Sequence, residues 1–162
     1  MTHSFRTTLL APPLPRPIAS LLPPLAGGRD LSHHAHASAV ARALAEHRER
    51  WVRHVRFDPT APYEVTVYDD GRHEVVLGAW LPGQVSRAHE HLGRPGAVLV
   101  VQGALEETTW HVVTDGPEPG RRHALRRTIE ADEVRSHGAV HVHALANTGA
   151  DPALALHVRS RG

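Results

Sequence analysis

Apolar residues recur with two different periods along the chain. In the first part, up to residue 55, they fall three or four positions apart, with arginine and glutamate on the other side. This spacing predicts one main amphipathic helix near residues 38–54, which Asp30 or Ser32 can cap and which runs to about residue 55. The apolar positions are Ala39, Val40, Ala43, Leu44, Trp51 and Val55.

From Pro62 onward the period changes to two. Residues 63–68 alternate apolar and polar side chains, and Asp70-Gly71 is a strong signal for a two-residue hairpin turn into residues 73–80. Further short apolar segments separated by turn residues are 97–101, 105–113, 123–129, 139–146 and 153–159. We therefore predict an all-β antiparallel sandwich or barrel of six to eight strands, packed with the helix.

The first 28 residues differ from the rest in composition. Six prolines lie within residues 12–24, and Gly27-Gly28 closes the segment. Proline fixes φ and lacks a backbone donor, so we predict an extended arm over residues 1–28 and a single domain over residues 29–162. We expect no secretory signal and a cytoplasmic location, because no uninterrupted apolar segment precedes a small-residue cleavage site.

Composition excludes several kinds of chemistry. The 162 residues contain no cysteine, which excludes disulfides, thiolate metal sites and a cysteine nucleophile. The formal net charge is +1, so no electrostatic argument favours a nucleic acid or an anionic membrane as partner. Histidine, by contrast, occurs 15 times, and it is the commonest metal ligand in proteins.

Two of these histidines are spaced for metal binding. His89 and His91 lie two apart in an extended segment, so their side chains point to the same face and can share one ion. A third ligand must come from another strand. His143 is the first candidate, His141 is an alternative of the same parity, and His137 is a third possibility. The histidines at 33, 34 and 36 are expected to form a solvated, poorly ordered polar run.

Two spacings in this region are those of the cupin signature: Gly-x5-His-x-His, from Gly83 to His91, and His-x3-Asn, from His143 to Asn147. The segments 80–108 and 156–158 resemble more narrowly the cysteine dioxygenase family of thiol dioxygenases, and the resemblance covers about residues 38–160. It implies a cupin antiparallel β-barrel, also called a double-stranded β-helix. It also implies Fe(II) held by three neutral histidines, and a small thiol that O2 oxidises to its sulfinic acid.

The resemblance favours His143 over His141, because Asn147 follows it by four residues. It also identifies Gly96 as a position where related families differ. Most cupins carry a glutamate ligand there, bacterial thiol dioxygenases lack this fourth ligand, and the animal enzymes have the cysteine of a Cys–Tyr crosslink. This chain cannot form that crosslink. Three imidazoles by themselves also suit zinc, nickel, copper and manganese.

The departures from the family concern the substrate. The family arginine that grips the substrate carboxylate, two residues after the tyrosine matched by Tyr63, is Val65 here. The family tyrosine two residues after the late histidine, His157, is Arg159 here. Strand parity predicts that Ala155, His157 and Arg159 face the pocket, where Arg159 could hold a carboxylate. We expect a thiol other than L-cysteine, such as a mercapto-acid or a mercaptoimidazole like ergothioneine.

Two alternatives remain open: an L-cysteine dioxygenase with a rearranged clamp, and a metal-binding cupin without redox chemistry. Other candidate site residues are His157, which can orient Arg159 or a water, Arg87 at the pocket mouth, and Trp80 and Tyr63 near the substrate. Glu106 and Glu107 are expected to be a strand-face charge and a packing or hydrogen-bonding residue, without a catalytic role. The expected partners are the thiol and O2 alone, and the oligomeric state is open.

Overall fold

A computed structural model describes residues 33–91, 93–112, 122–138 and 141–161. The predicted proline-rich arm and the helix cap at Asp30 or Ser32 lie outside the described residues. The boundary at residue 29 therefore stays a prediction. No helix within the described ranges is long and apolar enough to cross a membrane.

The helix is shorter than its apolar spacing predicted. Helix α1 (His33–Glu46) is followed by two short 3-10 helices, η2 (Arg48–Arg50) and η3 (Val52–His54). The indole N–H of Trp51 donates to the carbonyl of Leu44 at 3.0 Å, and the same carbonyl accepts the backbone N–H of His47 at 3.1 Å. Trp51 is thus buried as expected, but by the 3-10 turns and not by a continued α-helix.

The histidines at 33, 34 and 36 lie in the first turn of helix α1, which begins at His33. The His36 ring lies against the His73 ring on the sheet, with centroids 5.2 Å apart.

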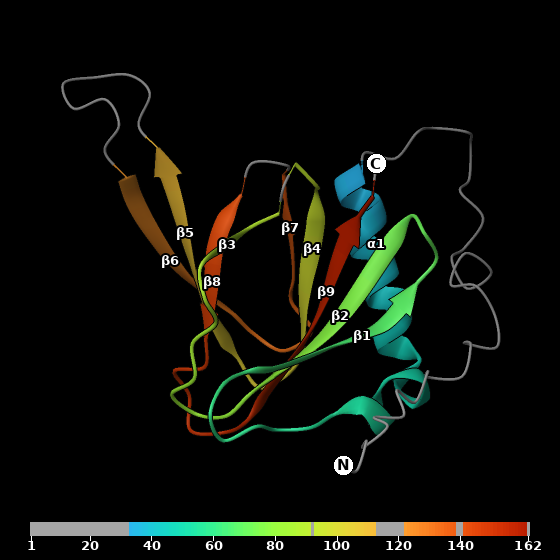
Figure 1. The fold of residues 1–162 in the computed structure, drawn as a ribbon, viewed down its shortest axis with the longest axis horizontal. Helices are drawn as coiled ribbons and strands as arrows, with labels where there is room; N and C mark the ends of the chain where they lie inside the picture. The colour runs from blue at the N-terminus through green and yellow to red at the C-terminus, as the bar shows by residue number, and fades with distance from the viewer. Residues whose placement is uncertain (1–32, 92, 113–121, 139–140, 162) are drawn as a thin grey trace, which may run out of the picture.

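The strands form two antiparallel sheets that face each other (Figure 1). One sheet has the order β1-β2-β9-β4-β7, and the other has the order β3-β8-β5-β6. The described residues contain nine strands, more than the six to eight predicted, because the short β3 and β7 carry too few residues to show a pattern. The strands are β1 (Tyr63–Asp69), β2 (His73–Trp80), β3 (His89–Glu90), β4 (Gly96–Gln102), β5 (Leu105–Val112), β6 (Arg122–Ile129), β7 (Val134–His137), β8 (Val142–Ala146) and β9 (Ala153–Ser160).

Alternating side chains of the five-stranded sheet separate two cores. Leu154, Leu156 and Val158 of β9 belong to the cluster under α1, which packs on the outer face of this sheet (Figure 1). Ala155 belongs to a second cluster, which draws residues from both sheets and so lies between them, together with Trp80 and Leu145. The parity predicted for β9 is therefore correct, and its inward side chains point into the space between the sheets.

Asp70 organises the predicted hairpin between β1 and β2. Its carboxylate accepts hydrogen bonds from the Tyr68 hydroxyl and the backbone N–H of Arg72, both at 2.9 Å, and from the N–H of His73 at 2.6 Å. Partial burial alone would raise the pKa of Asp70, but these donors outweigh it and the pKa lies below its ordinary value.

We expect Asp70→Ala to lower the free energy of unfolding by about 1 kcal/mol, since the carboxylate is partly exposed. Because the folded pKa is depressed, this stabilisation is fully present at neutral pH and is lost as the pH falls through that pKa. Urea unfolding of both proteins over a range of pH checks this. A difference that grows on acidification would contradict it, and Asp151→Ala, an exposed aspartate elsewhere, is the control.

Candidate metal centre

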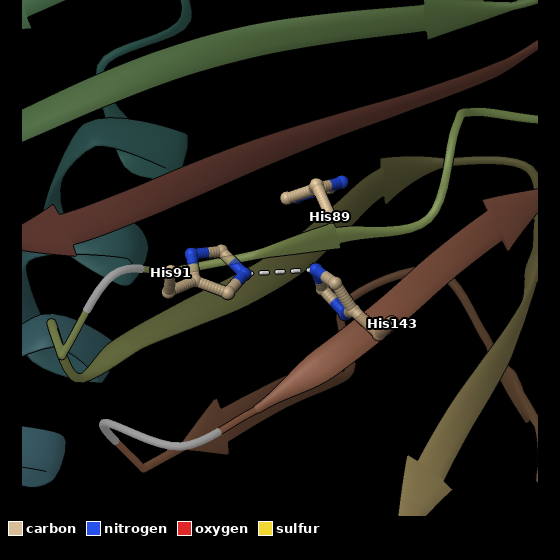
Figure 2. A group of neighbouring side chains, drawn as sticks. All are labelled: His89, His91 and His143. Carbon is tan, nitrogen blue, oxygen red and sulfur yellow. Dashed lines mark hydrogen bonds between the residues drawn. The ribbon is translucent and has the colours of Figure 1, made fainter.

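Cross-strand pairing brings the predicted histidines together. In the pair β3–β8, His89 lies directly opposite His143, and His91 follows at the end of β3. The ligand-capable nitrogens of His89, His91 and His143 all lie within 4.8 Å of one another. Figure 2 shows the rings of His91 and His143 facing each other, with the His89 ring close by. His143 is completely buried, and His91 nearly so.

Hydrogen bonds through Nδ1 leave Nε2 of His89 and Nε2 of His143 without a proton. Nδ1 of His89 lies 3.1 Å from the carbonyl of Arg87, and Nδ1 of His143 lies 2.6 Å from a carboxylate oxygen of Glu107. Each Nδ1 therefore carries the proton that it donates, and each Nε2 presents a lone pair. Nε2 of His89 is buried without a partner.

The third imidazole completes a donor set that suits a transition metal. Nε2 of His91 lies 2.9 Å from Nε2 of His143 (Figure 2). Burial lowers the pKa of His91 to about 2, with further contributions from neighbouring imidazoles and from Arg159, so its ring is neutral. Neutral imidazoles whose ring nitrogens converge in a buried space fit a divalent cation, and the unpartnered nitrogen of His89 is explained by one.

The two alternative third ligands lie farther from this centre or point elsewhere. His141 precedes β8, and its ring centroid lies 6.2 Å from that of His91, compared with 4.9 Å for His143. His137 packs closely on His91, at 4.0 Å between centroids, and stacks nearly parallel on His141. Among the described residues, His137 belongs to neither set of converging ligand atoms.

Glu107 is a site residue that the sequence reasoning set aside. The same carboxylate oxygen that faces His143 also lies 3.2 Å from Nε2 of His141. Burial alone would raise the pKa of Glu107, but the imidazole N–H groups of His141 and His143 hold it below its ordinary value. A buried anion therefore stands directly behind His143. The strand alternation of β5 places Glu107 inward, but only the pairing with β8 shows what it meets.

Gly96 has a steric explanation in this chain. It pairs with His137 across β4 and β7. A Cβ atom at Gly96 would overlap the carbonyl oxygen of Val158 and lie 2.7 Å from Cε1 of the His137 ring. The space that a side chain of residue 96 would need is thus occupied by backbone and by His137, so this position cannot offer a fourth ligand without rearrangement.

A cavity of about 610 Å³ opens onto His89 and His91. Arg159 and Arg87 line it, and so do Glu64, Glu90 and Arg94, to which the sequence assigned no role in the pocket. Arg159 also contacts Glu74, with 3.7 Å between Nη1 and Oε2. Its guanidinium is close enough to the centre to lower the pKa of both His91 and His157.

Not every candidate residue reaches the cavity. Tyr63 and Val65 both pack against the cluster under α1, on the other side of the sheet from the histidines. Trp80 is fully buried between the sheets and stacks on His157, with centroids 5.8 Å apart. Burial lowers the pKa of His157 well below its ordinary value, and its Nε2 has no partner among the described residues.

Asn147, the last residue of the His-x3-Asn spacing, has a structural role. Its side-chain amide donates to the carbonyls of Trp80 and Asp151, at 3.2 and 2.8 Å, and its oxygen accepts from the N–H of Gly149 at 3.0 Å. It therefore fastens the turn after β8 to the end of β2. The asparagine holds the strand that carries His143 in place, and it is not itself near the three imidazoles.

Solved structures with the same fold are known. The chain is 24% identical to protein TT1209 from Thermus thermophilus, covering 67% of this chain and 91% of that one, with a TM-score of 0.54. An uncharacterized conserved Klebsiella pneumoniae protein with a double-stranded β-helix domain is 21% identical, with coverages of 68% and 86% and a TM-score of 0.53. A cupin superfamily protein from Desulfitobacterium hafniense is 15% identical, with coverages of 68% and 87% and a TM-score of 0.51.

These likenesses identify the fold as that of the cupins, as predicted. A search of the curated proteins found no match. The sequence does match the cysteine dioxygenase type I family over residues 28–160, which is most of the chain and includes every histidine of the candidate centre. The chain therefore belongs to the cysteine dioxygenase type I family and carries, inside its cupin fold, three histidines suited to a metal ion.

Proposed function

We propose that this protein is an Fe(II)-dependent thiol dioxygenase that converts a small thiol and O2 to the sulfinate and a proton. Both oxygen atoms are added to sulfur, which loses four electrons while O2 gains four. The observation that carries the proposal is the converging nitrogens of His89, His91 and His143, in a member of this family whose Gly96 supplies no fourth ligand. Three protein ligands leave coordination positions for small molecules.

In this proposal the metal ion, its histidine ligands and the cavity residues have separate roles. A bound iron would supply the activation of O2 and favour the thiolate form of the substrate. Neutral imidazoles hold the ion without cancelling its charge, which keeps it attractive to an anionic sulfur. His89 and His91 line the cavity that Arg87 and Arg159 also line, and the substrate would reach the centre through it.

Arg159 supports a substrate with an acidic group. Its ion pair with Glu74 holds the guanidinium beside the cavity, and a carboxylate can accept two parallel hydrogen bonds from it. Val65, which matches the family's usual clamp, is apolar and packs on the far side of the sheet. We therefore propose a substrate other than L-cysteine, with a mercapto-acid or a mercaptoimidazole such as ergothioneine as the leading classes.

Oxygen uptake by the Fe(II)-loaded protein tests the function. The panel holds L-cysteine, cysteamine, mercapto-acids and ergothioneine, with the sulfinate identified by mass. Fast turnover of L-cysteine alone would contradict the substrate proposal and indicate a rearranged clamp. No uptake with any thiol would favour a metal-binding cupin without redox chemistry.

We expect Arg159→Ala to raise KM for an anionic thiol about 10- to 100-fold, the effect of losing hydrogen bonds to a charged group. Metal content should not change, because Arg159 is not in the converging set. Arg161→Ala is the matched control, since Arg161 also contacts Glu74 but does not line the cavity. An unchanged KM in steady-state kinetics would remove Arg159 from substrate binding.

A further inference from the structure

We infer that Glu107 is a positioning residue of the metal centre, whose carboxylate fixes the tautomer and orientation of His143, while His141 holds that carboxylate from another side. The inference rests on the metal site proposed above, but it does not depend on which reaction the site performs. It gives a specific role to a residue from which the sequence predicted only packing or hydrogen bonding.

The register of the two strands creates the contact. In the pair β5–β8, Thr109 lies opposite His143 and Glu107 lies opposite Leu145, so Glu107 and His143 are diagonal neighbours on the inner face. The carboxylate oxygen lies 2.6 Å from Nδ1 of His143, a short hydrogen bond typical of a charged acceptor. His143 is 0% exposed and Glu107 is 7% exposed, so bulk water competes little for this bond.

The direction of the bond determines what His143 offers to the centre. A carboxylate can only accept, so the proton of the neutral imidazole must lie on Nδ1, and Nε2 is left as a lone pair. That Nε2 is the atom facing His91 at 2.9 Å. Without Glu107, the proton would be free to occupy Nε2 and block it. The negative charge also makes the imidazole a stronger donor to a cation.

His141 completes the arrangement. Its Nε2 lies 3.2 Å from the same oxygen of Glu107, and its ring stacks on His137 with planes only 8° apart. A buried carboxylate with a single donor would be poorly satisfied, and a second N–H lowers the cost of keeping it charged. This gives a role to His141, which has the same strand parity as His143 but does not belong to the group of His89, His91 and His143.

A different use of these residues is a second cation site, because ligand atoms of Glu107, His141 and His143 also lie within 4.8 Å of one another. A cation there would need Nδ1 of His143 without its proton while Nε2 serves the first centre. The 2.6 Å contact between Nδ1 and the carboxylate is a hydrogen-bond distance, and it favours the positioning role.

The test is an anaerobic Co(II) titration of the full-length protein, followed by calorimetry and visible absorption. We expect Glu107→Gln, nearly the same shape without the charge, to weaken Co(II) binding about 10- to 100-fold. In the iron-loaded protein it should also raise the Fe(III)/Fe(II) midpoint potential, because the oxidised ion loses a nearby negative charge. A purely structural role for Glu107 would not shift this potential.

The neighbouring Glu106→Gln is the matched control. Glu106 pairs with Arg126 at 4.0 Å and does not belong to either histidine set, so affinity and potential should stay as in the original protein. Unchanged affinity and potential in a folded Glu107→Gln protein would overturn the inference. So would binding of two Co(II) ions per chain that falls to one in this variant.

The urea midpoint of the metal-free variant shows whether it is folded. If Glu107→Gln does not fold, Glu107→Asp decides: its carboxylate is one methylene farther from His143, and affinity should fall measurably, whereas unchanged affinity would contradict the inference. Because the titration uses no substrate, its failure leaves the thiol dioxygenase proposal intact. A negative thiol panel likewise leaves this result intact.

Discussion

Replacing His143 with alanine is expected to abolish metal binding and with it O2 uptake. The variant removes the nitrogen that faces His91 at 2.9 Å and lies opposite His89 across the strand pair. Two imidazoles alone make a weak site, so we expect metal affinity to fall by more than about 100-fold, beyond the range seen for residues that only support a ligand. Metal analysis of the purified protein and Co(II) titration measure this directly.

His141→Ala is the matched control for this prediction, because His141 has the same strand parity but belongs with Glu107 and not with His89 and His91. Because His141 acts on the centre only through Glu107, this variant should lose far less metal affinity than His143→Ala and should keep much of its activity. The reverse result, with binding lost in His141→Ala and kept in His143→Ala, would reassign the third ligand. The urea midpoint of each metal-free variant separates loss of the ligand from loss of the fold.

The second large effect is expected on stability. Gly96→Ala should lower the free energy of unfolding by about 3 kcal/mol, at the upper end of the cost of overpacking a core. The added methyl group would overlap the Val158 carbonyl, which is backbone and cannot rotate away, and would also press on the His137 ring. Urea unfolding of the metal-free protein measures the difference.

Two further variants test the cause. Gly149→Ala places its Cβ 3.4 Å from Asn147, an ordinary contact, and should change stability by less than about 0.5 kcal/mol. The double variant with Gly96→Ala and His137→Ala should recover only part of the loss, because the Val158 carbonyl still blocks the methyl group. A stable Gly96→Ala protein would show that residue 96 has room for a side chain, and a fourth ligand would then be possible there.

The local sequence predicted the features that depend on neighbouring residues. Asp70-Gly71 indicated a hairpin because its geometry is set within a few residues, and Asp70 does bind its own turn. His89 and His91 were expected to face the same way because alternate residues of an extended chain do so, and their ring centroids lie 5.1 Å apart. The predicted helix is present, but it ends at Glu46 and not near residue 55. The spacing of apolar residues could not predict this end, because it does not show that the Trp51 side chain bonds back to Leu44.

The relations between distant segments required the tertiary structure. His141 and His143 have the same parity, so periodicity could not separate them, and only the register of β8 against β3 and β5 places His143 beside His89 and Glu107 behind it. The sequence by itself determined which side chains share a face and which chemistry the missing cysteines exclude. The pairing of strands decided which faces meet, because register is fixed by packing over the whole barrel and by no single segment.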